Sequence, residues 1–217
     1  MNHPVYEKMK AESLTQKYAP YLDTADAAKC IRSTLKARFP GTKFSVKIER
    51  YSGGSSVNVQ WTDGPVLAMV EPIVDAFSGK GFDGMIDMAY YKTIFLMPDG
   101  SAAFAETSGT EGSMGTVPAA KEWKPAPEAI RVSPSCYIFA NRKVSKEAME
   151  RAIAAYGRKF GDELGEAIRS GKVKVEDSPY GGYTIESARS YQGSGSGSQY
   201  DGASCLYQFA ARRMVAA

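Results

Sequence analysis

Apolar residues recur with a helical period near the start of the chain. From residue 23 to residue 39 they follow steps of three and four, which is the spacing of an amphipathic helix. These positions are Ala28, Ile31, Leu35 and Phe39. Asp23 or Thr24 can cap the first turn, and Pro40-Gly41 ends the pattern. The sequence therefore predicts a helix over 23–39.

The period then changes from helical to strictly alternating. Phe44, Val46 and Ile48 share one face of the segment KFSVKIER, and the returning segment SSVNVQW repeats the alternation. Between them, Gly53-Gly54 suits the turn of a hairpin. We expect two half-buried antiparallel strands.

A second helix is predicted after the hairpin. Asp63 can accept hydrogen bonds from its first N–H groups, and Pro65 lies near the first turn, where a missing donor costs little. Pro72 interrupts the predicted helix. Its apolar stripe comprises Val66, Val70, Ile73, Val74 and Phe77. The order helix, strand, strand, helix predicts two helices on one face of a small antiparallel sheet.

Further elements follow downstream. Residues 94–97 and 102–105 form a second predicted hairpin around the turn Pro98-Asp99-Gly100, and the Gly- and Pro-rich segment 107–129 predicts a mobile loop. SCYIFAN is a strand candidate. Ser145 can cap a long helix that ends near Gly171.

Three glycines are spaced by four residues within this long helix. Gly157, Gly161 and Gly165 lower its helix propensity, so a compensating close approach of another element is expected, within the fold or across a dimer. A break near Gly161 is the alternative. Beyond the helix, segments 183–191 and 203–213 are predicted to form the arms of a terminal hairpin with a Gly/Ser-rich tip at 192–202.

The predicted fold class is α+β, with a small antiparallel sheet, helices on one face, a long C-terminal helix and a terminal β-hairpin. The predicted organisation is an N-terminal extension at 1–22, a module at 23–106, a mobile loop at 107–129, and a C-terminal part at 130–217 packed on the module.

The amino-acid composition disfavours several kinds of functional site. The single histidine, His3, lies in a segment expected to be loose, so catalytic or metal sites built on imidazole are disfavoured. The cysteines Cys30, Cys136 and Cys205 are far apart and odd in number, which indicates neither a disulfide framework nor a zinc site. With no signal-peptide core and no long apolar run, we expect a cytoplasmic protein of the bacterial host, without a membrane segment or a cofactor.

Charge is unevenly distributed along the chain. Residues 1–50 carry ten Lys/Arg and five Asp/Glu, whereas residues 51–100 carry two Lys/Arg and six Asp/Glu. Such polarity can steer a charged partner, and the alternative is a solvated lysine-rich surface. Five tyrosines are also interleaved with three arginines in the C-terminal segment, a composition that suits adaptable binding surfaces and could stack nucleobases; the alternative is a tyrosine-rich amphipathic sheet edge.

One pair of carboxylates has a spacing of interest. In GFDGMIDM, Asp83 and Asp87 are four residues apart, as an acid–base pair or the ligands of a divalent ion require. Turn and cap chemistry is the alternative explanation.

The run RYSGGSSVNVQWTDGP, preceded by RFPGTKFSV and followed by GFDGMIDM, resembles the large polyvalent protein-associated domain of type twenty-nine. This module occurs in proteins of plasmids and phages, and the likeness covers about residues 23–95. The resemblance implies an origin on a mobile genetic element and a role in its survival in the host. It implies no reaction, because no catalytic mechanism is established for the module.

Three hypotheses of different classes follow. The first is a non-enzymatic protein that binds a host protein or ribonucleoprotein complex and inhibits a defence system such as CRISPR–Cas or restriction. The second is a nucleic-acid-binding accessory protein. The third is an enzyme that depends on a metal or on the carboxylates of Asp63, Asp83 or Asp87, with Tyr51 as a further proton donor.

We expect the first hypothesis to hold, with no catalytic residue, metal or cofactor. The candidate partner-binding residues are Lys36, Lys43, Lys47, Arg50, Asp83, Asp87, Arg189, Tyr191, Tyr200, Arg212 and Arg213.

Overall fold

The fold is given by a computed structural model, which describes residues 1–84, 87–108, 124–193 and 200–213. Most of the loop predicted at 107–129 and the centre of the tip predicted at 192–202 lie outside these residues. The chain divides into an N-terminal unit, Met1–Trp61 with Ala68–Asn141, and a C-terminal unit, Thr62–Leu67 with Arg142–Ala217.

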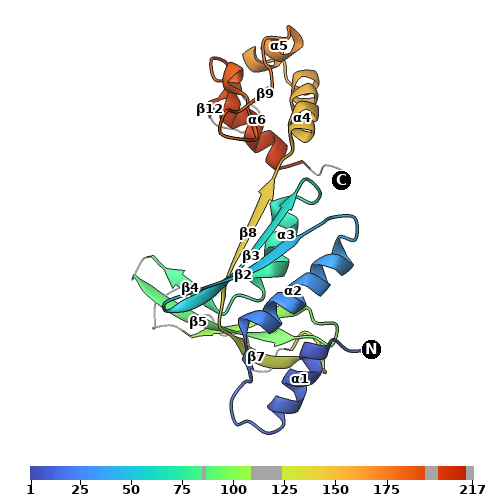
Figure 1. Cartoon of the computed structure of the whole chain (residues 1–217), viewed down its shortest axis with the longest axis vertical. Coiled ribbons are helices and arrows are strands. Elements are labelled where there is room, and N and C mark those ends of the chain that lie inside the picture. Colours follow the sequence, from blue (N-terminus) through green and yellow to red (C-terminus); the bar gives the residue numbers. More distant parts are fainter. Residues whose placement is uncertain (85–86, 109–123, 194–199, 214–217) are drawn as a thin grey trace. The chain divides into compact units, whose positions relative to one another are not determined.

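Both helices and strands occur in each part of the chain (Figure 1). The helices are α1 (Pro4–Ser13), α2 (Thr24–Arg38), α3 (Leu67–Asp75), α4 (Lys146–Lys159), α5 (Glu163–Arg169) and α6 (Gly202–Ala211). The strands of the N-terminal unit are β1 (Tyr21–Leu22), β2 (Ser45–Tyr51), β3 (Gly54–Thr62), β4 (Lys80–Asp83), β5 (Met88–Leu96), β6 (Ala102–Ser108), β7 (Ile130–Pro134) and β8 (Tyr137–Lys143), of which β3 and β8 end just beyond it. Shorter strands in the C-terminal unit are β9 (Glu176–Asp177), β10 (Tyr183–Thr184), β11 (Gln192–Gly193) and β12 (Tyr200–Asp201). The α+β class is confirmed.

The predicted β2–β3 hairpin is confirmed. Val46 pairs with Val59 and Tyr51 with Gly54, and Gly53 at the turn has a φ of 91°. The helix α2 lies beside β2 (Figure 1) and is capped by Asp23, whose Oδ1 accepts from the N–H of Asp26 at 2.8 Å. As predicted for a core residue, Trp61 is buried. β8 completes a three-stranded sheet in the order β2-β3-β8.

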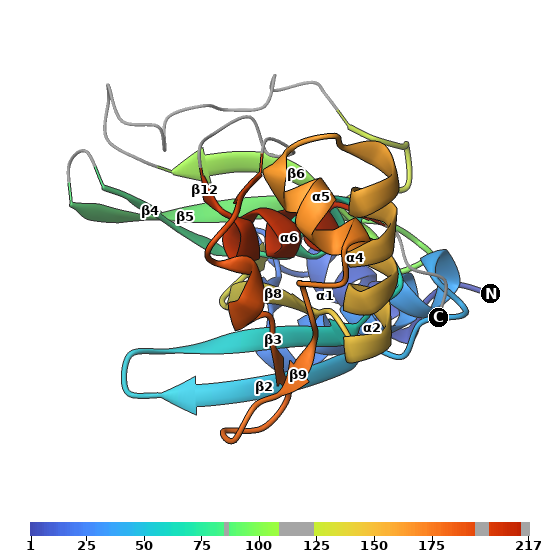
Figure 2. The same cartoon turned by 90° about the horizontal axis from the view of Figure 1, so that it is seen from above.

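A second sheet is built around β5. β6 pairs with one edge of β5 through the predicted hairpin, while the other edge is shared: β4 pairs with residues 88–91 and β7 with residues 94–96. β1 adds to β7 in parallel. The β4–β5 hairpin and the β2–β3 hairpin extend toward the same side of the N-terminal unit (Figure 2).

The N-terminal residues are part of the fold, so the predicted extension at 1–22 and the loose setting of His3 are wrong. His3 is the N-cap of α1, where its Nδ1 accepts from the N–H of Val5, and Pro4 opens the helix. Val5, Tyr6 and Met9 are buried. Their burial explains why this segment is ordered.

The two units also divide the chain at other places than predicted. β7 and most of β8 belong to the N-terminal unit because they pair with β5 and β3, and residues 62–67 belong to the C-terminal unit. The predicted boundary at 107–129 relied on composition, which does not show that the strands after it return to the first sheets.

The long helix predicted from Ser145 is two helices. Ser145 caps α4 as predicted, but α4 ends at Lys159, and Asp162 caps the separate helix α5. The alternative of a break near Gly161 is therefore confirmed. Gly157 and Gly165 are buried within the C-terminal unit. The predicted dimer stays a prediction, without a continuous glycine face to support it.

The terminal hairpin is present in a shorter form. Gln192–Gly193 pairs with Tyr200–Asp201, but the arm predicted at 203–213 is instead the helix α6, capped by Asp201. Ala203, Cys205, Leu206 and Ala210 of α6 are buried in a core that α4 and α5 complete. The spacing of these four buried residues is helical. The segment was predicted to be a strand because attention was given to its tyrosines and arginines instead.

Replacing Gly165 with alanine is expected to destabilise the C-terminal unit by about 1–3 kcal/mol. A Cβ at this position would lie only 2.1 Å from the carbonyl oxygen of Phe160, a backbone atom that cannot move aside. Gly161→Ala is the matched control, because a Cβ there meets no atom within 4 Å. Urea unfolding followed by circular dichroism checks both variants, and equal midpoints would contradict the packing role of Gly165.

Candidate functional site

A hollow in the N-terminal unit has a volume of about 830 Å³. We call it the tyrosine–lysine hollow. The end of the β2–β3 hairpin, the start of α2, strands β1, β4 and β5, and the β7–β8 corner all contribute to it. Its lining residues are Tyr21, Asp23, Thr24, Arg50, Tyr51, Gly54, Ser55, Lys80, Tyr91, Lys92, Thr93, Ser133, Pro134 and Ser135.

The hollow lies where β5 changes its pairing partner. Tyr91 is the last residue of β5 to pair with β4, and Ile94 is the first to pair with β7. The pairing with β6 is also irregular between Thr93 and Ile94, as in a β-bulge. The Oγ1 atom of Thr93 is buried and has no hydrogen-bond partner. This interruption of the sheet leaves a polar wall in the hollow.

Gly79 brings β4 to the hollow. Its N–H donates to the carbonyl of Cys136 at 3.0 Å, and its own carbonyl accepts from the N–H of Lys92 at 2.9 Å. A Cβ on Gly79 would lie 1.9 Å from the carbonyl oxygen of Pro134, so only glycine allows this approach. The next residue, Lys80, is thereby placed beside the β7–β8 corner.

Three tyrosines of the hollow are largely exposed. Tyr21, Tyr51 and Tyr91 expose 62%, 50% and 63% of their surface. Each comes from a different strand, and the ring of Tyr51 lies close to Gly54 across the hairpin. Exposed aromatic rings around a concave surface are typical of a binding site, since they offer apolar area with a polar end.

Arg50, Lys80 and Lys92 give the hollow a positive charge. None of the three forms an ion pair within the described part of the chain. The Nζ of Lys80 lies 6.0 Å from the ring centre of Tyr91 and 5.6 Å from that of Tyr137, which are cation–π distances. The ammonium group is therefore held among aromatic rings.

Negative charge in the lining is limited to Asp23. Its carboxylate already accepts the N–H of Asp26 as the cap of α2. The hydroxyls of Thr24 and Ser55 are hydrogen-bonded to each other and join α2 to the hairpin. The lining thus offers cations, hydroxyls and aromatic rings, a set suited to holding an anionic ligand with planar groups.

A second hollow of about 440 Å³ lies at the other end of α2. Arg32, Lys36 and Lys43 line it, together with Phe44 and no carboxylate. Arg32 also donates to the carbonyl of Val46 at 2.7 Å. This second hollow is basic but contains no tyrosine.

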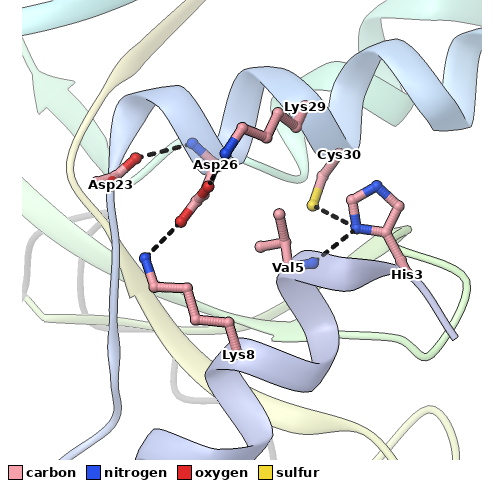
Figure 3. Close-up of polar contacts among 7 residues, drawn as sticks. All are labelled: His3, Val5, Lys8, Asp23, Asp26, Lys29 and Cys30. Carbon is pink, nitrogen blue, oxygen red and sulfur yellow. Dashed lines mark hydrogen bonds and ion pairs between the residues drawn. The ribbon is translucent and has the colours of Figure 1, made fainter.

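A buried carboxylate links α1 to α2 (Figure 3). The Asp26 side chain is 5% exposed and accepts from Lys8 at 2.7 Å and from Lys29 at 2.8 Å. Burial alone would raise the pKa of Asp26, but the hydrogen bonds from Lys29 and Lys8 outweigh it, so its pKa lies below the ordinary 3.8. This arrangement is structural.

Next to it, His3 and Cys30 lie together (Figure 3), with 3.7 Å between Nδ1 and Sγ. Burial raises the pKa of Cys30 to about 12. Burial also lowers the pKa of His3, although Asp99 and Asp26 oppose the effect. Both groups are neutral at pH 7, so the pair lacks the thiolate that a cysteine nucleophile requires.

The basic candidates from the sequence are divided between two hollows and one open face. Arg50 lines the tyrosine–lysine hollow, while Lys36 and Lys43 line the second hollow. Lys47 is exposed on β2 and points away from the face that carries Val46.

The C-terminal candidates do not form one surface, because the predicted arm is a helix. Arg189 pairs with Glu186 at 2.8 Å, and Tyr191 packs partly against the core of the unit. Arg212 ends α6, and the guanidinium of Arg213 lies 5.2 Å from the ring centre of Phe209. The side chain of Tyr200 is not among those that the structure describes.

The carboxylate candidates have turn roles. Asp83 ends β4, and its side chain is not among those described; Asp87 is exposed in the β4–β5 turn with a φ of 53°. Asp63 has a φ of 59°, and its Oδ1 accepts from the N–H of Ser145 at 2.9 Å. It does not cap the second helix, α3, which begins at Leu67, so that prediction is wrong.

Two negative findings hold for the described ranges of the chain. No group of three His, Cys, Asp or Glu side chains is close enough to hold a metal ion. No helix in the same ranges has the length and apolar character needed to span a membrane.

Comparison with protein families matches residues 22–145 to the model of Large polyvalent protein associated domain 29. The match covers more than half of the 217 residues. The chain belongs to this family. Its polyvalent-protein-associated domain extends beyond the 23–95 of the sequence resemblance, and every lining residue of the tyrosine–lysine hollow except Tyr21 lies within it. Such domains link the chain with polyvalent proteins of phages and plasmids. Comparisons with curated proteins and with solved structures give no match.

Sequence reasoning missed most of the hollow. Lys80, Tyr91 and Lys92 lie in a segment whose net charge is negative, so no basic cluster is visible there. They meet Arg50 because β4 and β5 converge on the β2–β3 hairpin. The sequence of β5 shows no regular alternation, so it gives no signal that Tyr91 and Thr93 share one face.

Proposed function

We propose that the chain is a non-enzymatic recognition protein of a mobile genetic element. It binds a macromolecular complex of the host cell through the tyrosine–lysine hollow. A defence complex, such as a CRISPR–Cas effector or a restriction enzyme with its nucleic acid, has the anionic and planar groups that this lining would recognise.

The observation that carries the proposal is the composition of the hollow. Exposed tyrosines and cations that form no ion pair among the described residues surround a concave surface, and the carboxylate in its lining, Asp23, caps a helix. The carboxylate of Asp23 is already engaged as the cap of α2, which favours binding over general acid–base chemistry in this lining. Binding energy, rather than turnover, is what such a surface supplies.

Capture from a bacterial lysate tests the proposal. The tagged wild-type chain should recover a partner in a stoichiometric ratio, identified by mass spectrometry, and the variant Tyr51→Ala/Tyr91→Ala should lose it. The matched control is Tyr18→Ala/Tyr180→Ala, since these tyrosines are more exposed, at 78% and 97%, and lie outside the hollow. Equal recovery by both double variants would contradict a role for the hollow.

A functional readout accompanies the capture. Phage plating on a host that carries a CRISPR–Cas or restriction system should rise when the wild-type chain is expressed, and the hollow variant should not raise it. Plating that rises equally with the hollow variant would contradict the proposed site.

A further inference from the structure

We infer that the ligand of the tyrosine–lysine hollow is a single-stranded segment of nucleic acid. This inference rests on the proposed function and names the chemical class that the hollow would bind. Unstacked bases would lie against the tyrosine rings, and phosphates would contact Arg50 and Lys80.

The rings and the charges lie on the same surface. Lys80 lies opposite Tyr91 in the β4–β5 pairing, and its Nζ lies 6.0 Å from the centre of that ring, so these two strands contribute a cation and a ring to the same face of the lining. Proteins that bind single strands combine aromatic rings, on which bases stack, with cations that follow the backbone. A ligand with planar groups alone would not contact the cations, and a ligand with anionic groups alone would not stack on the rings.

A single strand fits this surface better than a duplex. The tyrosines come from β1, β2 and β5 and line a concave hollow, whereas the bases of a duplex are already stacked on one another. The volume of about 830 Å³ lies in the upper part of the range for sites of small ligands, about 300–1,000 Å³. An unstacked nucleotide, that is, one base with its sugar and phosphate, has the size of such a small ligand.

The polar wall offers hydrogen bonds to such a ligand. The residues of the lining that carry hydroxyl groups include Thr24, Ser55, Ser133 and Ser135. Hydroxyl groups donate or accept as the ligand requires, so they serve base edges and phosphate oxygens alike. The wall would therefore tolerate different bases, and weak sequence preference is expected.

Binding of fluorescein-labelled oligothymidylate and oligouridylate, each of about 16 nucleotides, tests the inference by fluorescence anisotropy. The wild-type chain should bind the single strands more tightly than a DNA duplex of equal length. The two probes distinguish DNA from RNA as the source of the shared chemistry. Tyr51→Ala/Tyr91→Ala should weaken binding at least tenfold. Tyr51→Phe/Tyr91→Phe should retain most of the affinity, because stacking needs only the ring.

Charge is tested with a matched pair of double variants. Arg50→Ala/Lys80→Ala removes two cations from the tyrosine–lysine hollow, and Lys36→Ala/Lys43→Ala removes two from the second hollow. The first pair should reduce the slope of log affinity against log salt by about 1.4, from ~0.7 for each phosphate contact on a single strand. The second pair should reduce it less. Equal losses from the two pairs would show attraction to overall charge and would overturn the inference.

The two proposals fail in different ways. If neither probe binds but lysate capture still depends on Tyr51 and Tyr91 after nuclease treatment, the partner is a protein surface and the inference is overturned, while the proposed function stands. If neither probe binds and capture does not depend on the hollow, both are overturned. Urea midpoints of all variants confirm that each one is folded.

Discussion

Lys8→Met/Lys29→Met is expected to lower the free energy of unfolding of the N-terminal unit by about 3–5 kcal/mol. The double variant removes both cations from the Asp26 carboxylate, which is only 5% exposed, and leaves it buried without a counter-charge. Methionine keeps the length and apolar character of the lysine stem. Urea unfolding followed by tryptophan fluorescence, to which the buried Trp61 contributes, measures the change.

The single variants separate this effect from ordinary surface ion pairs. Lys8 and Lys29 are themselves about half exposed, at 49% and 60%, so losing one of them should cost about 1 kcal/mol or less. Adding Asp26→Asn to the double variant should recover part of the loss, because no buried charge remains. A double variant whose loss equals the sum of two small single losses would show that Asp26 needs no partner.

Acid provides a second readout of the same cluster. The pKa of Asp26 in the folded chain lies below its ordinary value of 3.8, so the unfolded chain binds the proton more readily. The stabilisation is therefore complete above the ordinary pKa and is lost as the pH falls from about 5 through the lowered folded pKa. Asp26→Asn should flatten this part of the stability profile.

Arg142→Ala is expected to destabilise the C-terminal unit by about 2–4 kcal/mol. Its guanidinium donates to the carbonyls of Ala211 and Arg213 at 2.9 Å each, and to Asp63 at 3.1 Å. Longer contacts at 3.4 Å reach the carbonyls of Gly64 and Ala210. One side chain thus satisfies carbonyls at the end of α6 and holds residues 62–67 in the unit.

Two controls define the role of Arg142. Arg142→Lys keeps the charge but offers donors from a single nitrogen, so it should recover only part of the stability. Arg151→Ala removes an exposed arginine from α4 and should change stability by less than about 0.5 kcal/mol. Amide hydrogen exchange should rise in the last turn of α6 with Arg142→Ala only. Unchanged exchange there would contradict the capping role.

Prediction from sequence was most successful where a local pattern coincided with a structural element. The α2 helix with its Asp23 cap, the β2–β3 hairpin and the β5–β6 hairpin were all predicted, because period and turn residues are properties of neighbouring residues. It failed at α6, where helical burial of Leu206 and Ala210 was mistaken for one arm of a hairpin. His3 was also misjudged, since its order depends on packing against distant residues such as Gly100.

The candidate site shows the same limit. Arg50 was selected because it stands in a visibly basic segment, whereas Lys80 and Lys92 were not, because their segment is acidic overall. No local rule reveals that Gly79 permits β4 to reach the β7–β8 corner, or that β5 changes partners beside Thr93. Both are consequences of pairing between segments far apart in the chain.

By itself, the sequence determined the α+β class, the elements of the family domain and the scarcity of imidazole chemistry, because these depend on composition and on short-range periodicity. The tertiary structure alone decided which rings, cations and hydroxyls share a hollow, and which carboxylate is buried between two lysines. The reason is physical: a strand's pattern specifies which of its faces is buried, but its neighbours are chosen by long-range pairing and packing.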